Sequence, residues 1–122
     1  MAKREPDPAA FLPLTPATYY MLLSLAEGEK HGYAILRDVS RRTEDRVSLN
    51  VGTLYAALRR LERQGLIIES DERPDPSLDD ERRRYYALSV LGRQVAAAEA
   101  RRLERAVDLA RAARLLPNPR FS

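Results

Sequence analysis

Residues 50–67 read NVGTLYAALRRLERQGLI, and this stretch carries the signals of a helix from its first residue onward. Asn50 is a preferred residue just before a helix, because its side chain accepts a hydrogen bond from a free backbone N–H of the first turn. Leu54, Leu58 and Leu61 follow at helical spacing and form one apolar stripe. The pattern predicts a capped amphipathic helix whose leucines belong to a core.

The end of this helix is marked as clearly as its start. Gly65 suits the left-handed conformation that closes many helices, and Leu66 then stands where a residue packs back against Leu61. Residues 66–70 are short, partly β-branched and placed after a glycine, which predicts a strand. The face opposite the leucines carries Thr53, Arg59, Arg60 and Arg63. A short helix with a cationic outer face, followed by a strand, is the arrangement that enters DNA in a winged helix-turn-helix.

Two further helices and a second strand are expected around this helix. Thr15-Pro16 opens the first helix and Gly28 ends it, while the second helix spans residues 31–42. Residues 84–88 predict the partner of the strand after Gly65, and the polar segment 71–83 between them forms a wing. Three helices with short connections fit a helix-turn-helix. The expected fold class is therefore mainly α with a small two-stranded antiparallel β wing.

The last helix is unusually long. Ser89 caps it and it continues to about Leu116, before two prolines. Its apolar seam consists of Leu91, Val95, Ala96, Leu103, Val107 and Ala110. One small three-helix core is too short to cover this seam, so we expect a second copy of the chain to pack on it in a two-fold dimer. The alternative is a helix that folds back on the first helix of its own chain.

These elements divide the chain into four parts. Residues 1–13 form a flexible or loosely docked arm with three prolines, and residues 14–88 form the winged helix-turn-helix. Residues 89–116 are the dimerisation helix, and residues 117–122 are a tail.

Four short motifs in a fixed order resemble those of the PadR-type transcriptional regulators. They are His31-Gly32-Tyr33-Ala34-Ile35, Gly52-Thr53-Leu54-Tyr55 with its following leucines, Arg83-Arg84-Tyr85-Tyr86-Ala87-Leu88, and Ser89 to Gly92. The resemblance covers roughly residues 14–113. It implies a sequence-specific DNA-binding regulator, more often a repressor, that acts as a homodimer in the cytoplasm. Two departures stand out, since the usual proline after the Leu-Tyr pair is Ala56 and the wing is acidic.

Candidate DNA contacts follow from the helix, from the resemblance and from the base of the wing. At the groove entrance we expect Asn50, Val51, Gly52, Thr53 and Tyr55, with Arg59 and Arg60 reaching phosphate or a guanine edge. The resemblance places His31 and Tyr33 near phosphate, beside Lys30. Arg82, Arg83 and Arg84 stand at the wing base. For Tyr55, a half-buried packing role stands beside the DNA contact, and the two roles are compatible.

The charge of the chain supports DNA binding only locally. The formal net charge is +3 over 122 residues, and residues 71–81 hold one arginine against six acids. Because phosphate repels such a wing tip, we expect Pro74 to Asp80 to bend away and only the wing base to touch DNA. The basic excess lies in separate arginine clusters, so those clusters carry the DNA hypothesis.

Other functional classes find little support. The chain has no cysteine and one histidine, which excludes a Cys/His zinc site, and it carries no catalytic or phosphate-loop motif. We therefore expect a non-enzyme without metal or cofactor. No apolar run approaches the length of a membrane span and no secretory signal is evident, which fits a cytoplasmic protein.

Two alternatives stay open beside the DNA-binding regulator. One is a winged-helix module that binds protein, which the near-neutral residues 1–70 and the acidic wing favour. The other is a ligand-gated repressor, since members of the resembled family sense phenolic compounds or drugs. Tyr19 or Tyr20 would then line the site, with core packing as their alternative role.

Overall fold

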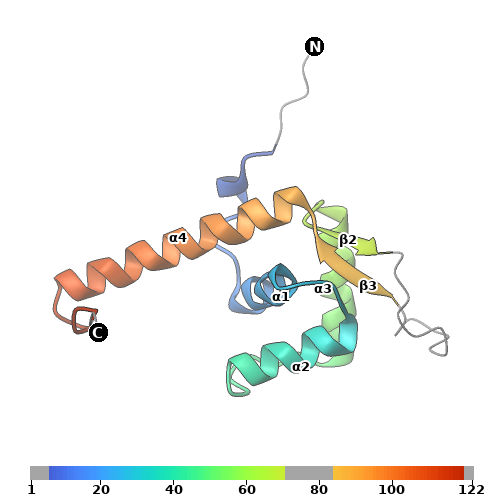
Figure 1. Cartoon of the computed structure of the whole chain (residues 1–122), viewed down its shortest axis with the longest axis horizontal. Coiled ribbons are helices and arrows are strands. Elements are labelled where there is room, and N and C mark those ends of the chain that lie inside the picture. The colour runs from blue at the N-terminus through green and yellow to red at the C-terminus, as the bar shows by residue number, and fades with distance from the viewer. Residues whose placement is uncertain (1–5, 71–83, 120–122) are drawn as a thin grey trace, which may run out of the picture.

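The computed structural model describes residues 6–70 and 84–119 (Figure 1). Its helices are the 3-10 helix η1 (Pro8–Phe11) and the α-helices α1 (Pro16–Ala26), α2 (Gly32–Arg42), α3 (Val51–Arg63) and α4 (Val90–Ala112). Its strands are β1 (Lys30–His31), β2 (Ile67–Ser70) and β3 (Tyr85–Leu88). The mainly α fold class with a small antiparallel sheet is confirmed. Among the described residues, no helix combines the length and the apolar character that a membrane crossing requires.

The ends of α3 form as the sequence predicts. The Asn50 side chain accepts a hydrogen bond from the Thr53 backbone N–H at 2.8 Å. At the other end Gly65 has φ 78°, and the Leu66 N–H donates to the Leu61 carbonyl at 3.0 Å. This pairing closes the helix and turns the chain directly into β2.

The sheet has three strands, one more than expected. Strand β3 lies in the centre, with β2 on one side and β1 on the other, all antiparallel. In β1, Lys30 pairs with Tyr86 and His31 with Tyr85. Strand β1 has only two residues, which is too short to show an alternation of polar and apolar side chains. The sequence therefore gives no signal for β1, which forms by pairing with β3.

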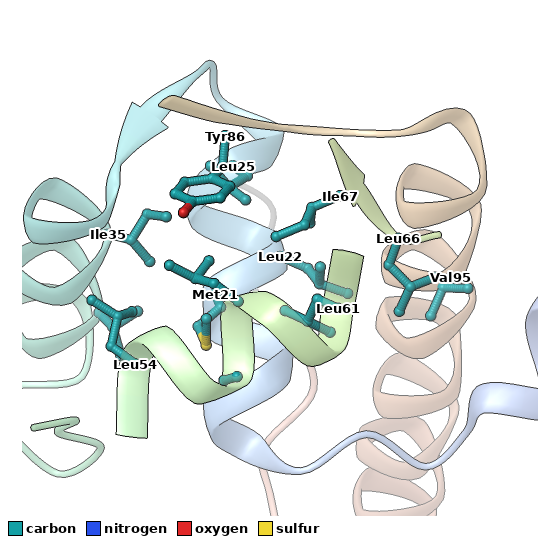
Figure 2. Packing of buried hydrophobic residues seen from close by; sticks show 13 residues of the cluster. Met21, Leu22, Leu25, Ile35, Leu54, Leu61, Leu66, Ile67, Tyr86 and Val95 are labelled. Carbon is teal, nitrogen blue, oxygen red and sulfur yellow. The ribbon is translucent and has the colours of Figure 1, made fainter. Parts of the chain in front are cut away.

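The hydrophobic core lies between α1, α2, α3 and the sheet, and the start of α4 closes it (Figure 2). Its buried residues are Met21, Leu22, Leu25, Ile35, Val39, Leu54, Ala57, Leu58, Leu61, Leu66, Ile67, Tyr86 and Val95. The three leucines of the α3 stripe are all among them. Val95 of α4 packs here beside Leu66, so it belongs to the core of its own chain and is not free for the dimer seam expected above.

Helix α4 begins on the domain and extends away from it (Figure 1). It ends at Ala112, earlier than the Leu116 expected from the sequence. The reason is a helix-closing turn in which Arg114 has φ 65° and the Leu115 N–H donates to the Ala110 carbonyl at 2.8 Å. A glycine usually marks such a turn, and an arginine there leaves no sequence signal.

The start of α4 is held tightly against the end of α3. The Ser89 hydroxyl donates to the Gly65 carbonyl at 2.6 Å, and the Ser89 N–H donates to the Leu66 carbonyl at 3.1 Å. A Cβ on Gly92 would lie only 1.9 Å from the Leu66 carbonyl oxygen. The start of α4 therefore meets the turn between α3 and β2 backbone to backbone, at a place where only glycine fits.

The segment before α1 also lies on α4. Helix η1 contacts α4, and Phe11 and Leu12 pack against the core. The Leu14 N–H donates to Glu99 Oε2 at 3.0 Å, and Arg102 Nε donates to Glu99 Oε1. The buried Glu99 carboxylate thus joins the N-terminal segment to α4.

Candidate nucleic-acid interface

Helix α3 separates a buried face from an exposed one. Its leucine stripe is buried, whereas its first turn, Val51 to Thr53, is exposed to solvent. The N–H groups of a first helical turn have no partner within the helix, and here the Asn50 side chain occupies only that of Thr53. The Nδ2 group of Asn50 stays available as a donor. The start of α3 therefore presents hydrogen-bond donors on an open surface.

The arginines of α3 differ in direction. Arg59 and Arg63 are exposed and make no hydrogen bond or ion pair with the described part of the chain. Arg60 instead donates from Nη2 to Thr18 Oγ1 of α1 at 3.3 Å. Of the two arginines expected to reach DNA, Arg59 points to solvent, whereas Arg60 is drawn toward α1.

His31 stands at the start of α2, where it caps the helix. Its Nδ1 accepts a hydrogen bond from the Ala34 N–H at 3.1 Å, and its ring lies edge-on to Tyr85, with centroids 5.5 Å apart. Burial lowers the pKa of His31, and the nearby positive charge of Arg37 lowers it further. A neutral ring that accepts at Nδ1 carries its proton at Nε2, so His31 offers a neutral N–H donor.

Two neighbours of His31 behave differently from each other. The Lys30 ammonium donates one of its three N–H groups to the Ser24 carbonyl near the end of α1, and its contact with phosphate stays a prediction. Tyr33 is exposed on the first turn of α2. Arg37, which the sequence reasoning omitted, is exposed and close enough to His31 to influence its pKa. Only its position within two turns of His31 on the same helix signalled it.

Tyr55 has the packing role that the sequence allows, and its contact with DNA stays a prediction. It is half-buried, and its ring lies against Gly32 at the start of α2. This position separates it from the exposed residues of the first turn of α3.

The base of the wing is described only in part. Arg84 is exposed and its Nε lies 3.6 Å from Glu69 Oε1, across the sheet. Arg82, Arg83 and the tip Pro74 to Asp80 lie outside the described residues.

Helix α2 is fastened by a buried acid that no sequence motif revealed. Asp38 is buried and accepts from both Arg41 and Arg42, and Arg42 also pairs with Glu27 beyond the end of α1. Although burial opposes ionisation, the nearby Ser24 hydroxyl and hydrogen bonds from the two arginines lower the pKa of Asp38 to about 2. Through Arg42, Asp38 thus helps to join α2 to the end of α1.

The expected dimer seam divides into two parts. Leu91 and Ala96 pack against the core of the same chain, as Val95 does. Leu103 and Val107 lie further along α4 and are each 37% exposed, and Ala110 is half-buried. Apart from Val90 at its start, the exposed large apolar residues of α4 are Leu103, Val107 and Leu109, all in its second half.

Comparison with known proteins identifies the family. Residues 21–98 match the transcriptional regulator PadR-like family. An uncharacterized protein of Lysinibacillus sphaericus is 30% identical over 73 residues, which are 60% of this chain and 64% of that protein. The chain thus spans just under two thirds of the length of this curated relative.

Solved structures share the fold. A PadR family transcription regulator of Clostridium difficile has 20% identity and a TM-score of 0.65, covering 80% of this chain and 97% of the other. A transcriptional regulator of Clostridium thermocellum has 24% identity and a TM-score of 0.62, covering 79% and 87%. RosR of H. salinarum has 24% identity and a TM-score of 0.60, covering 87% and 99%. With more than half of its length matched, the chain belongs to the transcriptional regulator PadR-like family, which is a family of regulators and not of enzymes.

Proposed function

We propose that the chain regulates transcription by placing α3 in the major groove of double-stranded DNA. One observation carries the proposal: the leucine face of α3 is buried while its capped first turn and Arg59 are exposed together. A helix N-terminus favours phosphate through its open N–H groups and its dipole. The exposed side chains of such a turn can then read base edges.

Each candidate contact has a separate task. Asn50, Val51, Gly52 and Thr53 approach the groove at the start of α3, and Arg59 reaches a guanine edge or a phosphate. On the flank, His31 donates from Nε2 to a phosphate and Tyr33 lies beside it. At the wing base, Arg82, Arg83 and Arg84 add positive charge. Lys30 and Arg60 hydrogen-bond within the domain and also add positive charge beside α2 and α3.

The proposed functional unit is a homodimer that acts as a repressor. The seam of exposed Leu103 and Val107 with half-buried Ala110 supports this assembly, since it lies outside the core of the described part of the chain. Two-fold symmetry would present two α3 helices to half-sites about one DNA turn apart. A dimer bound there occupies promoter DNA in the cytoplasm and excludes the transcription machinery.

DNA from upstream of the chain's own gene provides the direct test, with binding measured by fluorescence anisotropy over a salt series. The logarithm of the affinity should fall with the logarithm of salt, with a slope of about −0.9 per phosphate contact. Arg59→Ala should cost roughly 1–3 kcal/mol if Arg59 reads a base. Arg93→Ala is the matched control, because Arg93 is an exposed arginine on α4. Absence of any DNA preference at every salt concentration would favour a protein-binding module.

Ligand gating is a second candidate, favoured by one cavity. A hollow of about 650 Å³ lies between the N-terminal segment, α1 and α3, with mainly apolar walls. Phe11 and Met21 line it, as do Thr53 and Arg60 of α3. A compound bound there would touch the helix that reads DNA. Titration with phenolic acids should raise the melting temperature and change DNA affinity together, and an unchanged melting temperature would argue against this candidate.

A further inference from the structure

A close contact joins the starts of the two helices of the helix-turn-helix. A Cβ on Gly32, the first residue of α2, would lie 2.7 Å from the Tyr55 hydroxyl oxygen and 2.9 Å from Tyr55 Cζ. Gly32 is buried, and the hydroxyl of Tyr55 has almost no surface open to solvent. The φ angle of Gly32 is not in the left-handed range, so glycine is required here for space and not for its backbone freedom.

This contact stands where three elements join. Gly32 directly follows His31, which caps α2 through the Ala34 N–H and pairs with Tyr85 of the sheet. Tyr55 lies on the second turn of α3, next to the exposed turn that begins at Val51. The phenol of Tyr55 therefore spans the interval between the starts of α2 and α3.

We propose that Tyr55 is a positioning residue whose buried phenol sets the spacing between the start of α2 and the start of α3. The inference rests on the proposed function, in which both helix starts bind the same DNA half-site. Hydrogen bonds weaken steeply outside a narrow range of distance and angle. With α3 bound in the major groove, a change in this spacing would therefore move His31 and Tyr33 out of hydrogen-bonding distance of the phosphate. Tyr55 acts through the geometry of other residues, without touching DNA.

The size of Gly32 offers a specific perturbation. The atoms that a new methyl group would meet belong to the far end of a side chain, so Gly32→Ala displaces the phenol and leaves the backbone in place. DNA affinity should fall about tenfold, whereas thermal unfolding should change little. Tyr55→Leu removes the phenol and should weaken binding to a similar degree.

The double variant is the decisive measurement. In Gly32→Ala/Tyr55→Leu the new methyl group occupies space that the phenol has left, so affinity should return to within about threefold of the wild type. If the double variant instead loses about a hundredfold in DNA affinity, the product of the two single losses, the proposal is overturned. Tyr55→Phe keeps the ring and serves as the matched control, with affinity within about threefold of the wild type. A loss in Tyr55→Phe as large as that in Tyr55→Leu would show that the hydroxyl and not the ring carries the effect, and would also overturn it.

A second readout does not depend on DNA. Hydrogen exchange of the Ala34 amide, which His31 protects, should accelerate in Tyr55→Leu and slow again in the double variant. If the wild type binds no DNA, the proposed function fails, yet the exchange of Ala34 still decides whether Tyr55 positions α2. Unchanged exchange in Tyr55→Leu would overturn the inference even if the wild type binds DNA.

Discussion

The two halves of α4 belong to one continuous helix but differ in what surrounds them. The first half, residues 90–99, contains all the buried residues of α4: Gly92, Val95 and Glu99. The second half, residues 100–112, contains none, although it carries exposed Leu103 and Val107. Figure 1 shows the same division, because the helix leaves the domain about halfway along its length. The packing boundary therefore lies inside the helix, and its first half is part of the DNA-binding domain.

The comparison teaches that helix formation and burial are separate properties here. Alanine, arginine and glutamate favour helix along the whole of α4, whatever lies beside it. An isolated helix is marginal in water, however, and gains most of its stability from packing one face. The first half obtains this packing from its own chain, and in the proposed homodimer the second half would obtain it from the partner.

The largest effect is expected in the first half, from Gly92→Ala. In an ordinary helix interior this substitution stabilises by up to about 1 kcal/mol. Here the added methyl group would collide with the Leu66 carbonyl at 1.9 Å, and backbone is unable to swing aside. We expect a loss of about 3 kcal/mol in the free energy of unfolding, measured with urea. Gln94→Ala, on an exposed position of the same turn, should stay within about 0.5 kcal/mol. A neutral Gly92→Ala would show that the junction between α3 and α4 is loose.

Substitutions in the second half of α4 should weaken the proposed dimer. Replacing both Leu103 and Val107 by glutamate places charges on the exposed seam, and we expect the dimer dissociation constant to rise about a hundredfold, or ~2.7 kcal/mol. Sedimentation equilibrium measures this change. Circular dichroism should show that the winged domain stays folded, since neither residue is buried in it. A wild-type chain that is monomeric at all concentrations would contradict the dimer.

Glu99 lies at the boundary between the two halves of α4 and should make the free energy of unfolding depend on pH. Hydrogen bonds from Arg102 lower the pKa of the Glu99 carboxyl, against the effect of burial, and the Leu14 N–H lowers it further. Because the pKa is lower in the folded state, ionised Glu99 stabilises the fold fully above the pKa of an unfolded glutamate, about 4.3. This stabilisation is lost as the pH falls below that value. Glu99→Gln should destabilise by roughly 1–2 kcal/mol at pH 7. In urea unfolding from pH 7 to pH 3, the gap to the wild type should narrow below about pH 4, and a gap independent of pH would refute the assignment.

The smallest effect is expected at the far end of the second half. Arg114 adopts φ 65°, a conformation that costs an L-residue roughly 1–2 kcal/mol and glycine almost nothing. Arg114→Gly should therefore stabilise the end of α4, by about 0.5–1 kcal/mol after the greater freedom of glycine in the unfolded chain is counted. Slower exchange of the Leu115 amide, whose bond to Ala110 closes the helix, would be the local sign. An Arg114→Ala control, which keeps the Cβ, should gain nothing.

Local signals explain what could be predicted from sequence. Asn50 and Gly65 act on the backbone within a few residues, so the bounds of α3 could be predicted closely. The leucine stripe needs only helical spacing, and all three leucines are in the core. By contrast, β1 depends on pairing with a strand more than fifty residues away, and nothing in residues 30–31 announces it.

The directions of side chains in the candidate site were harder to predict. Arg60 and Arg59 are neighbours of the same type, yet only Arg60 meets Thr18 of α1. Lys30 finds the Ser24 carbonyl because α1 ends nearby in space. Val95 repeats the spacing of the α4 seam but faces Leu66 of its own chain. Each outcome depends on how helices are arranged around one another, which spacing along one helix does not contain.

The glycine contact between α4 and the end of α3 has a mechanical consequence. Twenty-three residues make α4 roughly 35 Å long at about 1.5 Å per residue. Because α4 is in tight contact with the turn after α3 at Gly92, the two would move together as a rigid unit. In the proposed homodimer, a rotation of α4 at the dimer interface would therefore move α3. Over this length, a tilt of about 6° at the dimer interface would displace α3 by roughly 3.5 Å, which is close to the rise of one base pair. The tolerated distance between operator half-sites would then be a measure of how stiff this joint is.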